Sequence, residues 1–128
     1  MKTSLQLRFG DIDRLGHVNN AVYAQFFDIG RIHYLKACLP ALDFENKTLV
    51  LVHLDIDFIH PTFVNDSIFV ETLVEQVGRR SLRMKQEIIE ENAGIKVRCS
   101  SVLSTFDMKT ATSFPMPEEW IKKLSLPL

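Results

Sequence analysis

The sequence is poor in cysteine and in net charge. Of its 128 residues only two are cysteines, and 15 basic residues nearly balance 16 acidic ones, which gives a formal charge of -1. Cys38 and Cys99 fit no zinc or redox spacing, so we expect two reduced, buried thiols. The near-neutral charge gives no global attraction to nucleic acid or to an anionic membrane, so an anionic ligand would need a local basic cluster.

Long apolar runs are also missing. Residues 1–5 lack the apolar centre of a signal peptide, and no run approaches the roughly 20 residues of a membrane span. We therefore expect a cytoplasmic protein with no membrane span. A content of 46% hydrophobic and 24% charged residues is typical of a folded chain and excludes disorder as a description of the whole. The length predicts a single domain over residues 1–128.

The period of the apolar pattern changes early in the chain. Alternation over residues 4–9 predicts a short, half-buried strand. Over residues 20–36 the apolar positions recur at spacings of three and four and cover more than one stripe, which predicts a long, largely buried helix. Asn19 or Asn20 is suited to cap its start. Gly30 in its middle indicates close packing against a backbone, such as that of a sheet.

Four strand-like segments follow, separated by turn residues. They cover residues 49–59, 67–77, 81–90 and 95–106, and a short helix opens at Pro117. The first of them places its even-numbered apolar residues on one face: Val50, Val52, Leu54, Ile56 and Phe58. Three tight hairpin connections predict an antiparallel α+β fold in which five strands wrap around one helix. The open edges of such a sheet, with a slightly positive mean hydropathy, predict a dimer with a continuous sheet.

The segment from Arg8 to Asn20 carries the residues best suited to chemistry. It holds two carboxylates, Asp11 and Asp13, and the imidazole of His17 directly before the predicted helix. The first amides of a helix are unpaired donors with a partial positive charge. Such amides would stabilise a developing oxyanion, while a neighbouring carboxylate supplies a base or a nucleophile. The pattern is therefore suited to acyl transfer.

This segment also resembles the signature of a known family. The matching run is Phe9-Gly10-Asp11-x-Asp13-x-x-Gly16-His17-Val18-Asn19-Asn20-x-x-Tyr23, which Phe27 and Arg31 continue along the helix. A later run resembles the second strand and turn of the same family: His53-Leu54-Asp55-Ile56-Asp57-Phe58-Ile59-His60-Pro61, with Asp66 after it. The family is that of the hotdog-fold acyl-CoA thioesterases of the 4-hydroxybenzoyl-CoA thioesterase type. The resemblance spans roughly residues 4–124 and implies a hotdog fold.

The resemblance implies roles for particular residues. Asp13 corresponds to the catalytic carboxylate, and the backbone amide that polarises the carbonyl falls near Asn20. The CoA nucleotide is expected at the turn of Arg79, Arg80 and Ser81, where guanidinium groups suit phosphates; the alternative is a solvated turn. Because sites in this family form between two subunits, Asp13 and the arginine turn are expected to act across a dimer.

Several of these residues have structural alternatives. Asp13 is also suited to an Asx turn, and Asp11 is expected to hold the loop through backbone amides. His17 has three candidate roles, which are to orient Asp13, to bind substrate or to hydrogen-bond within the loop. Tyr23 and Phe27 are predicted to bind substrate, although such positions are also typical of a core. The spacing of the two aspartates and the histidine matches no standard metal site, so we expect no metal and no cofactor.

The sequence thus predicts a cytoplasmic acyl-CoA thioesterase that forms a carboxylic acid and free CoA. Its expected partners are the acyl-CoA substrate and further copies of the chain, as a homodimer or a homotetramer (dimer of dimers). One alternative is a thioester carried by acyl carrier protein. Others are a non-catalytic acyl-binding hotdog protein and a hotdog dehydratase that uses His17. The acyl group, and the choice between base and nucleophile for Asp13, stay open.

Overall fold

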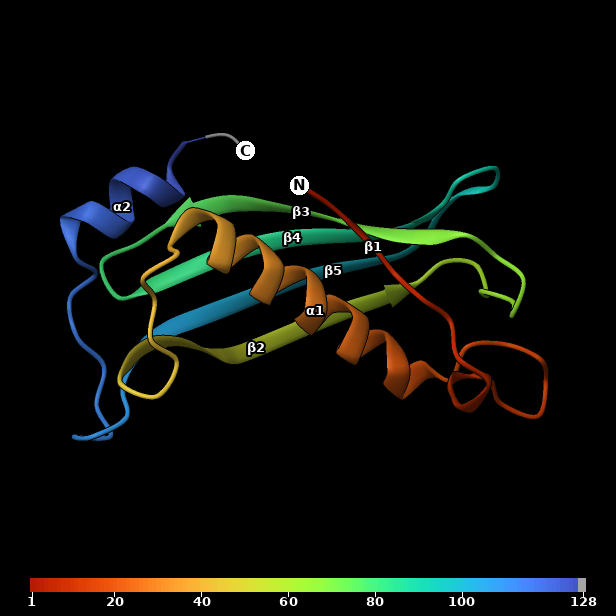
Figure 1. The fold of residues 1–128 in the computed structure, drawn as a ribbon, viewed down its shortest axis with the longest axis horizontal. Coiled ribbons are helices and arrows are strands. Elements are labelled where there is room, and N and C mark those ends of the chain that lie inside the picture. Colours follow the sequence, from red (N-terminus) through yellow and green to blue (C-terminus); the bar gives the residue numbers. More distant parts are fainter. Residues whose placement is uncertain (127–128) are drawn as a thin grey trace.

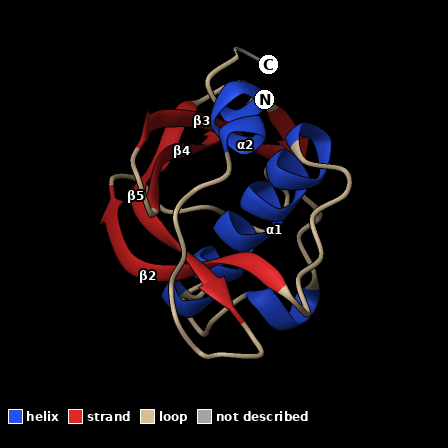
Figure 2. Cartoon of the chain, turned by 90° about the vertical axis from the view of Figure 1, so that its left-hand side faces the viewer, coloured by secondary structure: helices blue, strands red, loops and turns tan. Residues whose placement is uncertain are grey.

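In the computed structural model, which describes residues 1–126, an antiparallel sheet curves around one long helix (Figure 1). The elements are β1 (Lys2–Ser4), the 3-10 turn η1 (Phe9–Asp11), α1 (Asn20–Cys38), β2 (Lys47–Phe58), β3 (Ile68–Val77), β4 (Ser81–Glu90), β5 (Gly94–Asp107) and α2 (Glu118–Leu124). The strand order is β1-β3-β4-β5-β2. Seen from its end, the sheet bends past α1 and holds the helix on its concave side (Figure 2). The predicted five-stranded α+β hotdog architecture is confirmed.

The first strand is shorter and earlier than the alternation predicted. β1 covers only Lys2–Ser4 and pairs with the start of β3, from Lys2 with Glu71 to Ser4 with Phe69. The chain then leaves the sheet and makes the tight turn η1, so Phe9, expected on the apolar side of a strand, is 94% exposed. The prediction over residues 4–9 is wrong because alternation alone does not supply a neighbouring strand with which to pair.

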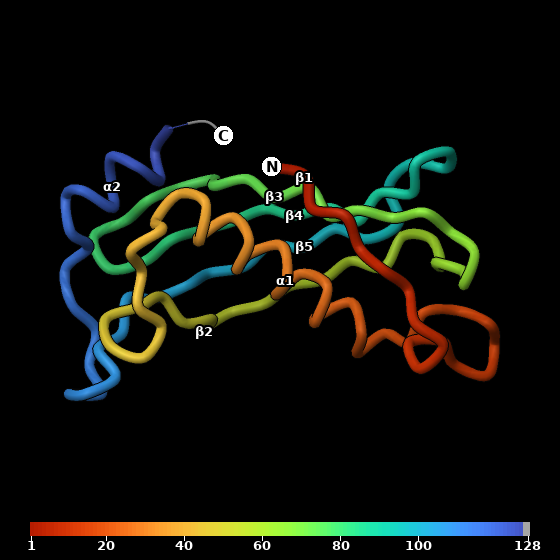
Figure 3. The backbone as a smooth tube through the Cα atoms, viewed as in Figure 1, coloured from red at the N-terminus to blue at the C-terminus, as the bar shows by residue number. Residues whose placement is uncertain are grey.

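The prediction of three hairpins is wrong at one connection. β3–β4 and β4–β5 are hairpins, but β2 pairs with β5 at the far edge of the sheet and is not adjacent to β3. Residues 59–67 must therefore cross the end of the sheet from one side to the other, a path visible in the tube of Figure 3. We call residues 59–67 the crossing loop. The physical reason is that β3 already has β1 and β4 as neighbours, which leaves β2 the open side of β5.

β2 also carries a bulge that changes which side chains face the helix. Leu51 pairs with Leu103 and His53 with Val102, so Val52 is an extra residue and is 60% exposed. A bulge shifts the alternation by one position. Leu49 before it packs in the core, as does Leu54 after it, although the two were predicted on opposite faces. The single face predicted for the even-numbered residues is therefore wrong before the bulge.

Helix α1 is capped as predicted and is buried along one side. The side chain of Asn19 accepts a hydrogen bond from the amide of Ala21, which confirms the first of the two predicted caps. The side facing the sheet is buried: Tyr23, Phe26, Phe27, Gly30, Arg31, Tyr34, Leu35 and Cys38. On the opposite side Ile29 is 48% exposed, because no other element of the described residues packs over it. The helix is therefore half-buried rather than buried all round.

A polar layer divides the core beneath the helix into two apolar clusters. Gln86, which is 1% exposed, donates to the carbonyl of Phe27 at 2.9 Å and to Thr72 at 3.0 Å, and accepts from Arg31 at 3.1 Å. Arg31 also lies 3.5 Å from the carboxylate of Asp28 one turn earlier, as their spacing predicts. These bonds satisfy polar groups that would be costly to bury alone.

Gly30 lies directly over this polar layer. A Cβ built there would be 2.7 Å from Gln86 Nε2, 2.8 Å from Val70 Cγ1 and 2.9 Å from Thr72 Oγ1. The predicted close approach of the helix to the sheet is confirmed, and it is side chains of the sheet that fill the space. Glycine is therefore required by contact with β3 and β4, not by its backbone conformation.

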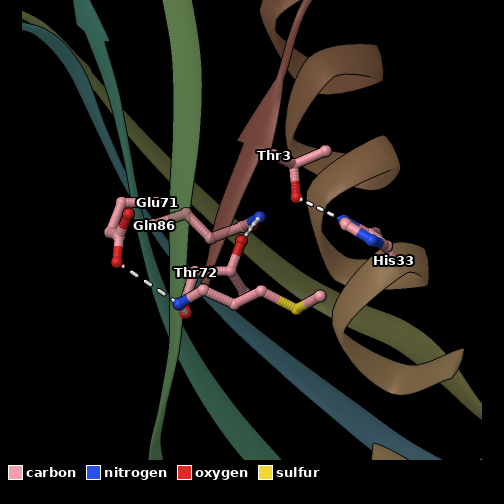
Figure 4. A network of polar contacts seen from close by, with 6 residues as sticks. Thr3, His33, Glu71, Thr72 and Gln86 are labelled. Carbon is pink, nitrogen blue, oxygen red and sulfur yellow. Dashed lines mark hydrogen bonds and ion pairs between the residues drawn. The ribbon is translucent and has the colours of Figure 1, made fainter. Parts of the chain in front are cut away.

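Three polar contacts fasten the N-terminal segment between the helix and β3 (Figure 4). Thr3 of β1 is hydrogen-bonded to His33 of α1 at 2.7 Å. The amino group of Met1 donates to the carbonyl of Thr72 at 2.7 Å and lies 3.3 Å from the Glu71 carboxylate. The three residues of β1 are thus tied both to the sheet and to the helix.

Two further sequence predictions agree with the structure, that of the C-terminal helix and that of two buried, free cysteines. α2 begins after Pro117, with acidic residues in its first turn and lysines in its last. Cys38 and Cys99 are free and buried, and burial raises the pKa of the Cys99 thiol to about 11. Within residues 1–126, neither helix has the length and apolarity needed to cross a membrane.

Candidate active site

Asp13 lies in a tight turn that its own carboxylate closes. Its Oδ1 accepts the amides of Leu15 at 2.9 Å and of His17 at 3.2 Å, and its backbone amide donates to the carbonyl of His17 at 2.8 Å. The Asx-type turn considered from the sequence is therefore present. Both hydrogen bonds found within residues 1–126 go to Oδ1, which leaves Oδ2 for another partner. The structural alternative and a chemical role are thus compatible in one carboxylate.

The crossing loop supports this turn from the other side. Ile12 pairs with Val18, and His17 pairs in turn with Phe63 of the crossing loop. The amide of Val18 donates to the carbonyl of Thr62 at 2.8 Å. The rings of His17 and Phe63 meet edge to face, with centroids 5.1 Å apart and planes at 83°. The segment from His17 to Val18 is therefore held between the aspartate turn and the crossing loop.

The start of α1 presents a free backbone donor beside Asp13. The carbonyl and side chain of Asn19 satisfy the amides of Val22 and Ala21, and the amide of Asn19 itself donates to the carbonyl of Asp11. The amide of Asn20 has no hydrogen-bond partner in the described part of the chain. It points from the positive end of a 19-residue helix, where an anionic oxygen is stabilised.

Asp13 and Asn20 line one cleft of about 370 Å³. Its other lining residues come from the loop, the helix and the end of β2: Leu15, His17, Val18, Tyr23, Phe58, Ile59, His60 and Pro61. The Tyr23 ring lies 5.6 Å from that of Phe58, which gives the cleft an aromatic wall. A larger hollow of about 500 Å³ lies between β3 and α2 and does not include Asp13. Size therefore does not identify the site, whereas the combination of carboxylate, free amide and apolar wall does.

Asp11 has a different environment from Asp13. It is 2% exposed, and its carboxylate accepts the Arg8 amide at 2.9 Å and the Arg8 guanidinium at 3.0 Å. The hydrogen bond and charge of Arg8 lower the pKa of this carboxyl. As predicted, Asp11 holds the loop through a backbone amide. Of the two carboxylates in this loop, Asp13 is therefore the one that lines the cleft.

The turn of Arg79, Arg80 and Ser81 lies at the other end of the molecule. It joins β3 to β4, whereas the loop of Asp13 and the start of α1 lie beside the opposite ends of these strands (Figure 1). The length of β3 puts about 30 Å between them. Both arginines are exposed, and Arg80 donates to the Ser113 hydroxyl at 3.0 Å. One copy of the chain therefore does not bring the arginine turn to Asp13.

The two aromatic residues predicted to bind substrate separate in the structure. Tyr23 is 2% exposed and lines the cleft. Phe27 is fully buried beneath the helix, does not line the cleft and packs in the apolar core. Its position supports the core alternative, because the fourth residue after Tyr23 is turned further toward the sheet.

His60 and the apolar end of β2 were not predicted as site residues. In the sequence His60 is distant from Asp13, and only the crossing loop brings it to the cleft. Pro61 marked the end of the strand, but no residue pattern indicates where the following loop goes. Among the residues that the structure describes, no three histidine, cysteine or carboxylate side chains are placed to hold a metal ion.

Comparison with known proteins shows the family of the chain. The model of the thioesterase-like superfamily matches residues 7–124. The long-chain acyl-CoA thioesterase FadM of Escherichia coli is 27% identical, over 97% of this chain and 96% of that protein. A 1,4-dihydroxy-2-naphthoyl-CoA hydrolase of Synechococcus elongatus is 25% identical, over 91% and 90%. The crystal structure of a Thermus thermophilus thioesterase complexed with coenzyme A and Zn is 27% identical and superimposes with a TM-score of 0.86, over 98% and 97%. The chain belongs to the thioesterase-like superfamily and has its hotdog fold.

Proposed function

We propose that this protein hydrolyses acyl-CoA thioesters with Asp13 as the catalytic carboxylate. One observation carries the proposal: Asp13 and the free amide of Asn20 line the same cleft, beside an aromatic wall. Two relatives that span nearly the whole chain are an acyl-CoA thioesterase and an acyl-CoA hydrolase, which supports CoA rather than acyl carrier protein as the carrier.

The reaction needs an oxygen nucleophile and a place for negative charge. The Asn20 amide donates to the thioester carbonyl oxygen as that oxygen becomes negative, a contribution of typically ~10²–10³ in rate for one such donor. Asp13 takes a proton from water, whose oxygen adds to the carbonyl carbon; the carbon–sulfur bond then breaks, and the CoA thiolate takes up a proton. In the second route an oxygen of the Asp13 carboxylate adds to the carbonyl carbon, and the carbon–sulfur bond breaks to release the CoA thiolate and leave an anhydride. Water then hydrolyses the anhydride to the free acid and the Asp13 carboxylate, and the thiolate takes up the proton that is released.

Turnover in ¹⁸O-labelled water tests the direct route. When water opens the anhydride at the Asp13 carbonyl carbon, labelled oxygen enters the Asp13 carboxylate, whereas base catalysis leaves that side chain unlabelled. Mass spectrometry of the peptide that contains Asp13 reads the result. Tyr23 and His17 contact the substrate in either route, because both line the cleft.

Replacing Asp13 tests the function itself. We expect Asp13→Asn to lower kcat by ~10²–10⁴, the usual contribution of a positioned carboxylate. The matched control is Asp43→Asn, which removes an exposed aspartate from the loop between α1 and β2, at the opposite end of the sheet. Full activity of Asp13→Asn would remove Asp13 from the mechanism. Binding of acyl-CoA with no hydrolysis by the unaltered protein would instead favour the non-catalytic alternative.

We further propose that residues 1–128 act as one domain and that the active unit is a homodimer. β2 is an edge strand with exposed side chains along most of its length, so two copies can join their sheets there. Such a dimer supplies Arg79 and Arg80 of one copy to the cleft of the other, where they bind the CoA phosphates. A dimer of dimers and a cytoplasmic location stay predictions from the sequence.

Complementation tests the shared site. Asp13→Asn and the double variant Arg79→Ala/Arg80→Ala are each expected to be weak enzymes, for different reasons. Because each mixed dimer contains one intact site, random mixing should restore about a quarter of the activity of the unaltered protein. Absence of restoration, with dimers shown by analytical ultracentrifugation, would place both groups in one subunit's site or remove the arginines from it.

A further inference from the structure

Lys96 is an extra residue in β5. Ile88 of β4 pairs with Val97 and Ile89 pairs with Ile95, so Lys96 forms a bulge between them. A bulge redirects a side chain and frees backbone groups from the ladder. On the β2 side of β5, the carbonyl of Lys96 accepts two amides at 3.0 Å each, those of Ile59 and His60. Lys96 therefore fixes the point at which the crossing loop leaves β2.

The side chain of Lys96 reaches the other half of the same loop. It is 10% exposed, and its Nζ lies 3.9 Å from Asp66 Oδ2 and 5.9 Å from the centre of the Phe63 ring. The same Asp66 oxygen accepts the Phe63 amide at 2.8 Å. A buried ammonium group is costly without a counter-charge, so Lys96 and Asp66 stabilise one another. Together they determine how the turn from Phe63 to Asp66 is placed.

This turn is in direct contact with the segment that holds Asp13. Phe63 pairs with His17, and Thr62 accepts the amide of Val18 at 2.8 Å. His17 in turn exchanges backbone and carboxylate hydrogen bonds with Asp13. A continuous series of contacts thus runs from the bulge through the crossing loop to the carboxylate.

We propose that Lys96 and Asp66 are positioning residues for the reaction. They hold the crossing loop so that His17 and Val18 keep Asp13 aligned with the Asn20 amide. Lys96 does not line the cleft, so it acts through the loop and not on the substrate. The proposal rests on the proposed role of Asp13. The sequence did not predict this positioning role for Lys96, because the bulge that turns Lys96 inward is visible only in the strand register.

Four variants separate charge from packing. Lys96→Met keeps the length of the side chain and removes the ammonium group, while Lys96→Arg keeps the charge. Asp66→Asn keeps an oxygen for the Phe63 amide and removes the carboxylate charge. The control is Lys85→Met, which breaks an ion pair with Glu75 at 3.2 Å. Lys85 is 57% exposed and does not line the cleft.

Two readouts are measured on each variant: kcat and KM for the acyl-CoA that the unaltered protein hydrolyses fastest, and the NMR signals of the His17 ring. Misplacement of a reacting group by a distant change costs up to ~100-fold. We expect Lys96→Met and Asp66→Asn each to lower kcat by roughly 10–100-fold, with KM changed by less than about threefold. The chemical shifts of the His17 ring should change in both variants, because the Phe63 ring that packs against it is displaced. Lys96→Arg should keep most of kcat, and Lys85→Met should change neither readout.

The double variant Lys96→Met/Asp66→Asn should lose no more kcat than the more affected single variant, because both changes break one interaction. A kcat for Lys96→Met within about twofold of the unaltered value overturns the proposal. Loss of kcat with unmoved His17 signals overturns it as well, since the link to the loop would be absent. If Lys96→Met does not fold, Asp66→Asn and Lys96→Arg decide by the same criteria. Failure of Asp13 as the catalyst is recognised separately, by full activity of Asp13→Asn, and the His17 signals then still test whether Lys96 positions the loop.

Discussion

The two ends of the molecule differ in how their apolar side chains are covered. At one end α2 covers the core, so that Leu124 is 1% exposed and packs with Leu35 and Met84 beneath the end of α1. At the other end, among residues 1–126, no second helix closes the core beside the start of α1, and irregular loops carry the cleft. Within residues 1–126, the two most exposed large apolar side chains lie on those loops: Phe9 is 94% exposed and Leu15 is 76% exposed.

Because of this difference, the residues that mainly stabilise the fold lie near one end of α1, and those proposed to bind and react with substrate lie near the other. The α2 end is closed by its own chain and has a mainly structural role. The cleft end is held by turns, a bulge and hydrogen bonds, and its apolar surface is left for a ligand or a second copy. Between them, the polar layer around Gln86 lets each cluster pack separately.

The largest effects are expected from cavities made in each cluster. Leu35→Ala at the α2 end and Ile88→Ala at the cleft end should each lower the free energy of unfolding by about 2–5 kcal/mol. Leu35 is some 20 Å along the helix from Asn20, so its loss should leave kcat of the folded protein unchanged. Ile88 adjoins the Lys96 bulge, so its loss should also lower kcat. Urea unfolding and activity at low temperature measure both; equal kcat values would contradict the division between the ends.

A smaller loss is expected from the boundary between the two clusters. Gly30→Ala adds a methyl group within 3 Å of Gln86, whose amide is fixed by three hydrogen bonds. Overpacking typically costs about 1–3 kcal/mol, and the better helix propensity of alanine returns at most about 1 kcal/mol of it. A net loss of stability in thermal unfolding is expected. Ala37→Gly, on the exposed side of the same helix, is the control for propensity alone. Increased stability of Gly30→Ala would contradict the close contact.

Most of the fold was predictable because it depends on local patterns. Asn19 caps α1, Gly30 marks the contact with the sheet, and the hairpin turns lie where glycine and asparagine predicted them. The errors occur where the structure depends on which strands pair with one another. Neither the place of β2 beside β5 nor the bulge at Val52 is encoded in a local pattern, because both depend on which strands are already occupied.

The same division applies to the candidate site. Asp13 and Asn20 were predictable because a carboxylate and a helix start are close in sequence. His60 and Lys96 were not, because the crossing loop brings them to the site from β2 and β5. The distance from Asp13 to the arginine turn was not predictable either, since it follows from the direction of β3.

The cleft end should also respond to acid through Asp11. Arg8 lowers the pKa of this carboxyl in the folded protein, so Asp11 contributes stability that is present above its unfolded pKa of about 3.9 and is lost as pH falls through the folded value. Asp11→Asn should therefore be less stable than the unaltered protein at pH 7, by less than the Gly30 variant is. This difference should disappear as the pH falls below the lowered pKa of Asp11 in the folded protein. Unfolding curves from pH 7 to pH 2 measure this. A constant difference across that range would show that the carboxylate charge is not the cause.

The smallest effect on stability is expected where the two ends expose apolar side chains. Leu15 lines the cleft, and Leu126, 62% exposed, is its counterpart beside α2. Because both side chains are largely in water, Leu15→Ser and Leu126→Ser should each change the free energy of unfolding by less than about 0.5 kcal/mol. Only Leu15 is placed to contact a bound acyl chain, and losing that contact, about 1.4 kcal/mol, should raise KM for acyl-CoA about tenfold at unchanged kcat. Steady-state kinetics on both variants measure this, and the same KM in both would mean that the exposed apolar surface at the cleft end does not bind substrate.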